Sequence, residues 1–302
     1  MNGTAVARTG MVAIVGRPNV GKSTLLNALV GAHVSITARK PQTTRTRVLG
    51  VLTQGTPPAT TQFIFVDTPG LQTKARTLLA RRMNESVRTA LAGVDAVVLV
   101  IDARGWHPAD DAVLALLPAQ RGNVILALNK TDTLARYDDV LPVLADCARR
   151  YPFAALVPVS AEKRRQLDEL LDEIAKLLPP GEPLFDADAV TDRSLRFLAA
   201  ETIREKAFRL LGDELPYGIA VAIERWQETQ QRVEIVAALI VERESHKPIV
   251  IGARGAKLRE IGRLARADIE TLIGKPVVLR TWVRVKRGWS EDAGTLRALG
   301  YE

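Results

Sequence analysis

The residues with the clearest chemistry form the stretch GRPNVGKS at positions 16–23, which fits the pattern G-x-x-x-x-G-K-[S/T]. An apolar run, MVAIV, precedes it and an amphipathic run, TLLNALV, follows, so we expect a buried strand before the loop and a helix after it. In that setting Gly16 and Gly21 let backbone N–H groups approach phosphates at a helix N-terminus. Lys22 would add a positive charge at the β- and γ-phosphates, and the Ser23 hydroxyl would ligate Mg²⁺. The stretch therefore predicts a nucleoside triphosphate site.

A second stretch, DTPG at residues 67–70, follows the apolar run QFIFV. Asp67 would join the Mg²⁺ shell, and Gly70 offers a backbone N–H to a γ-phosphate. The polar stretch ARKPQTTRTR lies between the first helix and this strand, where a loop that responds to the γ-phosphate belongs. Thr43 and Thr44 are both candidates for completing the Mg²⁺ shell, and the sequence does not choose between them.

Two stretches are expected to bind the nucleotide base: NKTD at residues 129–132 and the pair SA at 160–161. A carboxylate at Asp132 can accept hydrogen bonds from both N1–H and N2–H₂ of guanine, a donor pair that adenine lacks. Asn129 can hold O6 and N7 of the base and also the site itself, while the stem of Lys130 can pack over the ring. A backbone N–H of the SA pair would lie near O6. In this order, after a phosphate-binding loop, the motifs predict GTP rather than ATP.

The attacking water lacks its usual partner. Leu71 follows DTPG, whereas Ras-like GTPases carry a glutamine there that orients the water. One alternative is a backbone or second-water arrangement that a partner improves. Another is a K⁺ ion beside the phosphates ligated by Asn19, although Asn19 could equally serve only to cap a turn. A third is Gln72 reaching round. Each alternative predicts slow intrinsic hydrolysis.

These motifs define the candidate residues. The catalytic candidates are Lys22, Thr43, Thr44, Asp67 and Gly70, and the metal candidates are Ser23, Thr43, Thr44 and Asp67. The nucleotide-binding candidates are Gly16, Arg17, Pro18, Asn19, Val20, Gly21, Lys22, Ser23, Thr24, Asp67, Thr68, Pro69, Gly70, Leu71, Asn129, Lys130, Thr131, Asp132, Ser160 and Ala161.

Alternating strands and helices must position these residues. Buried strands that alternate with helices predict a doubly wound, mostly parallel α/β sheet, whose ligands bind at the carboxyl ends of the strands. The expected strands are 11–16, 62–70, 96–102, 124–130 and 156–161, and the expected helices are 22–31, 76–92, 108–117, 136–150 and 166–178. Prolines then mark a linker at 179–190, which separates a first domain, 1–178, from a second, 191–302. The second domain reads helix, strand, strand, helix, helix, strand, which is an α+β order.

The second domain contains VIGARGAKLREIG, residues 250–262. Its Gly-x-x-Gly can be a simple turn or a clamp for a nucleic-acid backbone, and taken alone the motif favours the turn. The surrounding residues 247–287 hold 11 Lys or Arg against 3 Asp or Glu, a net charge of +8. Such a concentration of positive charge beside the glycines favours a polyanionic partner.

The motifs GRPNVGKSTLLNAL, SITARKPQTTR, FVDTPGL, NKTD and VSA, followed by VIGARGAKLREIG and KRGWSEDAG, resemble the Era branch of the TrmE-Era-EngA-like GTPases. The resemblance covers nearly the whole chain and implies a P-loop GTPase domain followed by a type II KH domain. It implies a cytoplasmic factor that binds the 3′ end of 16S rRNA and acts in 30S subunit assembly and rRNA maturation, coupled to growth and division. Peripheral contact with the anionic inner membrane is also implied, and an apolar residue at Leu71 is usual in this family.

With the resemblance, the clamp becomes the favoured interpretation of the Gly-x-x-Gly loop, because KH loops grip about four nucleotides. The RNA-binding candidates are Gly252, Ala253, Arg254, Gly255 and Lys257. The family often has Lys and Gly where this chain has Ala253 and Arg254, so one positive charge is kept but moved. Trp282 and Trp289 could stack on bases or pack the sheet, and packing is favoured for Trp282.

Composition limits the remaining classes of function. No apolar run reaches the 18 or so residues that a membrane helix needs, and the first residues, MNGTAVARTG, do not read as a signal peptide. The single cysteine, Cys147, lies in a helical run and is expected to be a packed thiol. We expect a cytoplasmic monomer. Rival interpretations are a switch that uses its basic region on anionic lipid, and an RNA-binding scaffold whose GTPase half is uncoupled from RNA.

Overall fold

The protein is described by a computed structural model that covers residues 6–37, 43–71, 77–117, 122–211, 215 and 218–301. Backbone contacts divide the chain into two compact units. Unit 1 comprises Met1–Ser35, Thr44–Lys74 and Met83–Asp192, and unit 2 comprises Ile36–Thr43, Ala75–Arg82 and Arg193–Glu302. None of the helices in the described ranges is long and apolar enough to span a lipid bilayer.

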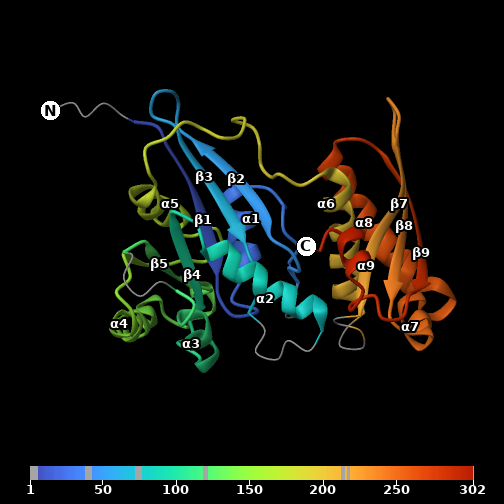
Figure 1. Ribbon diagram of the computed structural model, residues 1–302, viewed down its shortest axis with the longest axis horizontal. Helices are drawn as coiled ribbons and strands as arrows, with labels where there is room; N and C mark the ends of the chain where they lie inside the picture. Colours follow the sequence, from blue (N-terminus) through green and yellow to red (C-terminus); the bar gives the residue numbers. More distant parts are fainter. Residues whose placement is uncertain are drawn as a thin grey trace. The chain divides into compact units, whose positions relative to one another are not determined.

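Unit 1 contains a six-stranded sheet in the order β2-β3-β1-β4-β5-β6 (Figure 1). Neighbouring strands are parallel except for β2 and β3, which are antiparallel. The strands are β1 (Arg8–Val15), β2 (Val48–Gln54), β3 (Thr61–Asp67), β4 (Ala96–Asp102), β5 (Val124–Asn129) and β6 (Ala155–Pro158). The mostly parallel sheet confirms the expected fold class, and its carboxyl ends carry the motifs described above.

Strand β2 is not expected from the sequence. Its segment, VLGVLTQ, has Gly50 in the middle, and glycine weakens a strand pattern. A Cβ at Gly50 would come within 2.6 Å of Leu26 Cδ1 and 2.8 Å of Val30 Cγ2. The glycine is therefore needed because the first helix lies close against the strand, a contact that no local pattern reveals.

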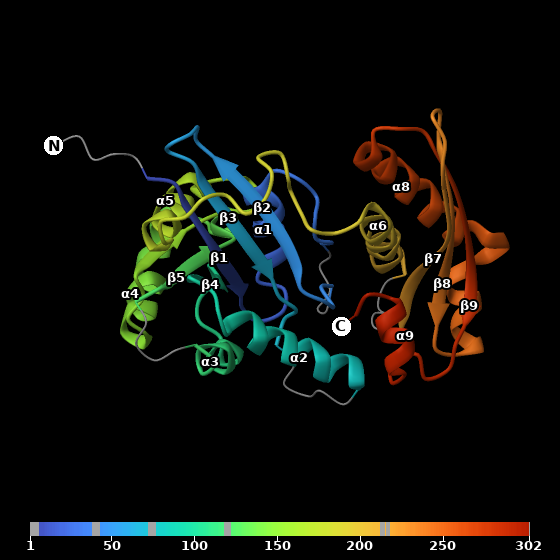
Figure 2. The ribbon, with the colours of Figure 1, turned by 45° about the horizontal axis from the view of Figure 1, so that its top comes forward.

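The helices of the first part of the chain begin and end close to the expected positions, and Figure 2 shows α1 and α2 on opposite sides of the sheet. They are α1 (Lys22–Val30), α2 (Leu78–Leu91), α3 (Pro108–Leu114), α4 (Val140–Arg150) and α5 (Leu167–Leu177), with short 3₁₀ turns η1 (Thr131–Thr133) and η2 (Tyr137–Asp139). One core cluster joins alternate residues of β1, β4 and β5 to apolar residues of α2, α3 and α4. Cys147 is fully buried in this cluster, and burial raises the pKa of its thiol to about 11, as a packed thiol requires.

The stretch expected to be a linker belongs to unit 1, and the change of unit comes between Asp192 and Arg193. The buried side chain of Gln62 accepts hydrogen bonds from the N–H groups of Leu184 (2.7 Å) and Phe185 (3.0 Å). Farther along, the Val51 N–H donates to the carbonyl of Val190 (2.9 Å). The prolines of 179–190 do end the helical pattern, but the segment then runs along the sheet because these strand residues satisfy its backbone.

Unit 2 contains a three-stranded sheet in the order β7-β8-β9, in which β7 and β8 are antiparallel and β8 and β9 are parallel. Its principal elements are α6 (Leu195–Leu210), β7 (Ile219–Glu228), β8 (Val233–Val241), α7 (Lys247–Ile251), α8 (Ala256–Ile273) and β9 (Val277–Val285). Short 3₁₀ turns η4 (Glu244–His246) and η5 (Ala253–Gly255) flank α7, and a further helix, α9 (Ala293–Ala298), is not expected from the sequence. One apolar cluster packs α6 and α8 against one face of this sheet.

Candidate functional site

The phosphate-binding loop lies between β1 and α1, as expected. Gly16 (φ 156°) and Gly21 (φ 98°) both have positive φ. A Cβ at Gly16 would come within 2.4 Å of the Val100 carbonyl oxygen, and one at Gly21 within 2.4 Å of Asn129 Nδ2. Both glycines are therefore required by neighbouring strands as well as by any phosphate.

Lys22 is buried at the start of α1. Its Nζ donates to the carbonyl oxygens of Gly16 (3.0 Å) and Arg17 (3.1 Å). Burial lowers the pKa of this ammonium to about 8, although the Asp67 carboxylate opposes the shift. An anionic phosphate in the loop would supply the strong partner that the buried charge needs.

Ser23, Thr44 and Asp67 converge at the candidate metal position. Ser23 Oγ lies 2.8 Å from Thr44 Oγ1 and donates to Asp67 Oδ2 over 2.8 Å, and Thr44 Oγ1 lies 3.2 Å from the same carboxylate oxygen. All three residues are buried, and Asp67 Oδ1 has no hydrogen-bond partner among the described residues. Burial raises the pKa of Asp67, and a cation would counter that shift. One carboxylate and two hydroxyls are hard oxygen donors that suit Mg²⁺, and of the two threonines it is Thr44 that reaches them.

The guanine motif is held to the phosphate loop by Asn129. Its Nδ2 donates to the Val20 carbonyl (2.8 Å), and its Oδ1 accepts from the Ala161 N–H (3.0 Å). Asn129 therefore holds the site together, which is one of its two expected roles. The Ala161 N–H, one of the two backbone donors of the SA pair, is engaged with Asn129 in this structure. Ser160 Oγ donates to Asp132 Oδ1 and so orients the carboxylate expected to read the base.

Lys130 is positioned by a carboxylate, Asp102, that lies outside the nucleotide motifs. Its Nζ donates to the Asn19 carbonyl (2.5 Å) and to Asp102 Oδ2 (2.9 Å). The Arg104 side chain donates to both oxygens of Asp102 (2.8 and 2.9 Å). Burial opposes ionisation of Asp102, but these hydrogen bonds outweigh it and hold its pKa below the usual range. Asp102 ends the β4 strand, so its place at a carboxyl strand end is a signal that could have identified it.

A second unexpected carboxylate holds the other side of the loop. Arg17 Nε lies 3.2 Å from Asp110 Oδ1, and fully buried Asp110 also accepts from the His107 N–H (2.9 Å) at the start of α3. The Arg17 side chain is thus engaged by α3.

Other candidates have structural roles in the described ranges. The Thr68 hydroxyl donates to the Ile14 carbonyl (2.9 Å). A Cβ at Gly70 would meet Pro18 at 2.9–3.1 Å, and Leu71 packs against the core. Asn19 is exposed with a left-handed backbone (φ 66°). Gln72 and residues 38–42 lie outside the described residues.

The Gly-x-x-Gly loop joins α7 to α8 through η5. Gly252 (φ 72°), Arg254 (φ 50°) and Gly255 (φ 78°) are all left-handed, and Ala253 and Arg254 are exposed. A Cβ at Gly252 would lie 2.8–3.0 Å from Lys257, including its backbone nitrogen, whereas one at Gly255 would meet the flexible Arg259 side chain at 3.1 Å. The first glycine is therefore required by the fold itself.

The preference for packing at Trp282 is wrong. Trp289 is fully buried, whereas Trp282 is 42% exposed and its indole N–H donates to Glu224 (2.8 Å). Val277 and Val283 of β9 enter the core, and residues at even positions lie on the other face of the strand. A tryptophan at 282 therefore stands on the face away from this core.

Comparison with known proteins agrees with this arrangement. Residues 11–130 match the family described as 50S ribosome-binding GTPase, and residues 214–290 match the KH domain. GTPase Era of Bordetella avium is 53% identical over 98% of both chains, and GTPase Era of Xanthomonas axonopodis pv. citri is 48% identical over 99% of both.

Two solved structures also match. A point variant of Aquifex aeolicus Era bound to GDP·AlF₄⁻ is 42% identical, with a TM-score of 0.92 over 97% of this chain and 99% of that one. Era in complex with MgGDPNP and nucleotides 1506–1542 of 16S ribosomal RNA gives the same identity and TM-score over 98% and 99%. With a P-loop, a guanine motif and a KH unit in the same order over the full length of these relatives, the chain belongs to the GTPase Era family, whose members hydrolyse GTP.

Proposed function

We propose that this GTPase binds the 3′ end of 16S rRNA through the loop 252–255 and the start of α8, and that it acts in assembly and rRNA maturation of the 30S subunit. The observation that carries the proposal is the loop geometry. Three residues of positive φ in four form a tight turn that leaves the side chains of Ala253 and Arg254 exposed, and Lys257 and Arg259 follow in the first turn of α8. A relative of the same fold is known in complex with a fragment of 16S rRNA.

In unit 1 the proposal assigns Mg²⁺ to Ser23, Thr44 and Asp67, because their oxygens already converge. A relative holds MgGDPNP. The metal supplies charge that neutralises the phosphates during transfer to water. Asn19 stays the candidate for a K⁺ ion, since its exposed side chain stands on the phosphate loop.

Control of RNA binding by the nucleotide is the second part of the proposal. The segments 36–43 and 75–82 group with unit 2, and the first of them overlaps the stretch ARKPQTTRTR, which is expected to respond to the γ-phosphate. Within unit 2 the buried carboxylate of Glu205 accepts hydrogen bonds from the N–H (3.1 Å) and hydroxyl (3.0 Å) of Thr37. These contacts support a path by which a change next to Thr44 would alter α6 of the KH unit.

The experiment is a titration of a short single-stranded RNA, copied from the 3′ end of 16S rRNA, against the protein with a GTP analogue and then with GDP. A scrambled RNA is the sequence control, and one salt concentration is kept throughout because phosphate contacts depend on it. Gly252→Asp is unsuitable, since the new side chain would collide with Lys257. Arg254→Asp instead reverses a charge at an exposed left-handed position that Asp tolerates.

The matched control is Arg149→Glu, which changes the charge equally on an exposed arginine of α4 in unit 1. Arg254→Asp should weaken RNA binding about tenfold and reduce its salt dependence, with a slope change of about 0.7 for each phosphate that is no longer neutralised. The control should bind as the unchanged protein does. Equal affinity for both RNAs and both variants would refute the loop assignment, and equal affinity with GTP analogue and GDP would refute the coupling. Binding of anionic vesicles in place of RNA would favour a membrane role for residues 247–287 over the cytoplasmic, monomeric RNA-binding role proposed here.

A further inference from the structure

Ser35 is not among the sequence candidates, yet its side chain reaches the metal carboxylate. It is buried, with 3% of its surface exposed, and its Oγ donates to Asp67 Oδ2 over 2.8 Å. The same oxygen accepts hydrogen bonds from the hydroxyls of Ser23 and Thr44. Asp67 Oδ2 therefore has three hydroxyl neighbours, of which only two belong to the candidate metal set.

The backbone of Ser35 is fixed by one side chain of α1. Asn27 Oδ1 accepts hydrogen bonds from the N–H groups of Val34 (3.0 Å) and Ser35 (2.9 Å), and Asn27 Nδ2 donates to the Ser35 carbonyl (2.6 Å). Both ends of the carboxamide are thus used on two consecutive residues. The chain enters the segment 36–43 directly after this anchor.

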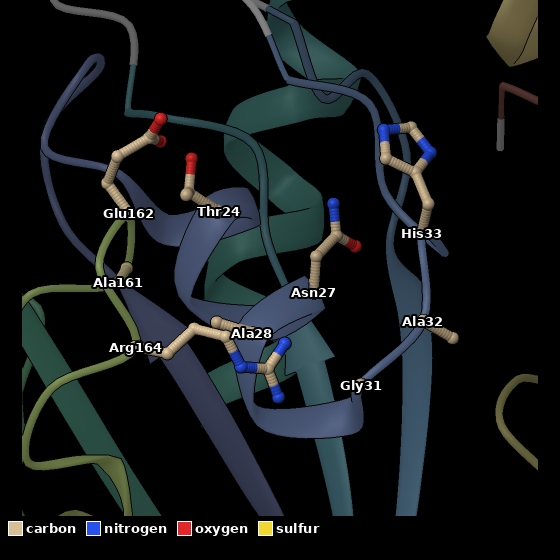
Figure 3. Close-up of a pocket in the computed structure, with 9 residues that line it drawn as sticks. All are labelled: Thr24, Asn27, Ala28, Gly31, Ala32, His33, Ala161, Glu162 and Arg164. Atoms are coloured by element: carbon tan, nitrogen blue, oxygen red, sulfur yellow. The ribbon is translucent and has the colours of Figure 1, made fainter.

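Figure 3 shows Asn27 rising from α1 between Thr24 and the segment that carries His33, at the side of a pocket of about 340 Å³. Arg164 and Ala161 line the same pocket from the loop after β6. Asn27 is half-buried, so the isosteric change to Asp keeps its shape while it replaces an amide donor by an anionic acceptor.

We propose that Asn27 and Ser35 are positioning residues for Mg²⁺. Asn27 fixes Ser35, and the Ser35 hydroxyl orients the Asp67 carboxylate toward the metal while Ser23 and Thr44 turn their oxygens to the ion. The role follows from the anchoring of Ser35, because the hydrogen bonds of Ser23 and Thr44 to Asp67 must readjust when their oxygens ligate the ion, whereas Ser35 is held by Asn27 and is not a candidate ligand. Ser35, anchored by α1, is the donor that stays. This inference rests on the proposed Mg²⁺ site.

We expect substitutions of Ser35 and Asn27 to lower the affinity for Mg²⁺ and to change the release of GDP little when the metal is absent. Loss of a hydrogen-bonding partner of a metal ligand costs roughly 10- to 100-fold in affinity for the metal. Ser35→Ala should therefore raise the Mg²⁺ concentration that half-maximally slows release of GDP by about tenfold. Asn27→Asp should act in the same direction, because it keeps the acceptor but sets a carboxylate oxygen against the Ser35 carbonyl.

The test follows release of a fluorescent GDP from the full-length protein while Mg²⁺ is titrated, and again in excess EDTA. Ser35→Thr, which keeps a hydroxyl, is the rescue variant, and Ser86→Ala on α2 is the matched control for loss of a hydroxyl. Thermal melting checks that each variant is folded. We expect Ser35→Ala and Asn27→Asp to shift the Mg²⁺ midpoint but to release GDP in EDTA within about twofold of the unchanged protein, since the metal is then absent from both.

An unchanged Mg²⁺ midpoint in Ser35→Ala would overturn the inference. A GDP release rate in EDTA that rises by the same factor as the midpoint would also overturn it, because Ser35 would then act through packing. Failure of Ser35→Thr to restore the midpoint, in a folded protein, would count against the hydroxyl. If the unchanged protein itself releases GDP independently of Mg²⁺, the metal site of the proposed function fails instead. The two failures are therefore distinguishable.

Discussion

The buried Lys22 ammonium predicts that GDP binding takes up a proton at alkaline pH. Burial lowers the pKa of Lys22 to about 8, and the phosphates would raise it again on binding. A group whose pKa is raised by a ligand favours binding below its free value, and this advantage is lost as the pH climbs above that value. With a free pKa of about 8, roughly three quarters of the lysines are neutral at pH 8.5, so affinity for GDP should fall about fourfold between pH 7 and 8.5.

The assay is isothermal titration calorimetry of GDP in several buffers that differ in ionisation enthalpy. The dependence of the observed heat on the buffer should correspond to uptake of about 0.75 proton at pH 8.5 and about 0.1 at pH 7. Guanosine 5′-monophosphate, which lacks the β-phosphate, is the control for titration of the base. Absence of proton uptake at pH 8.5, or equal uptake with the monophosphate, would refute the assignment to Lys22.

Four further predictions follow from contacts in the nucleotide site and in the core of unit 1. Lys22→Met should leave a protein that GDP stabilises little in urea titrations, because it removes the positive charge expected to face the phosphates. Asp132→Asn should reduce affinity for GDP about a hundredfold or more and favour xanthosine diphosphate, whose C2 carbonyl can accept from the new amide, in competition assays. Thr44→Ala should slow single-turnover GTP hydrolysis at least about tenfold, whereas Thr43→Ala should stay within about twofold of the unchanged protein; equal effects would contradict the choice of Thr44. Cys147, buried with a thiol pKa of about 11, should react with iodoacetamide at pH 8 only as fast as the protein unfolds, and rapid labelling of folded protein would contradict its burial.

The fold is largely predictable because its signals are local. Apolar runs and turn residues mark all the parallel strands and place the nucleotide motifs at their carboxyl ends. Strand β2 escapes prediction because its glycine, Gly50, is required by the close approach of Leu26 from another segment of the chain, which the local sequence does not show. The packing of the predicted linker is hidden for the same kind of reason, since its prolines are visible in the sequence but the role of Gln62, which satisfies its backbone, is not.

Roles within the site are less predictable than its residue types. The motifs identify Asp67 and Lys130, but not the partners that orient them. Ser35 begins the stretch SITARKPQTTR and Asp102 ends strand β4, yet neither position alone tells which side chain the residue contacts. Thr43 and Thr44 are neighbours of identical chemistry, so only the backbone direction could separate them. Packing is the natural expectation for Trp282 because tryptophan is usually buried, yet the alternation of β9 places it outside.

Gly252 could be retained in evolution either for folding or for RNA binding. The steric demand at this position shows that folding alone requires the glycine. Because Lys257 fills the space that a Cβ would need, a descendant that no longer bound RNA would still be selected against replacing this glycine, for the sake of folding. Position 254 is under no such restraint, since its arginine is exposed and holds a left-handed conformation that Gly or Asn adopts more readily. Mutational drift after loss of the RNA partner should therefore erase the charge at 254 first. Among relatives, the glycine would then indicate only that the fold is retained, whereas a positive charge in the loop would indicate that RNA binding is retained.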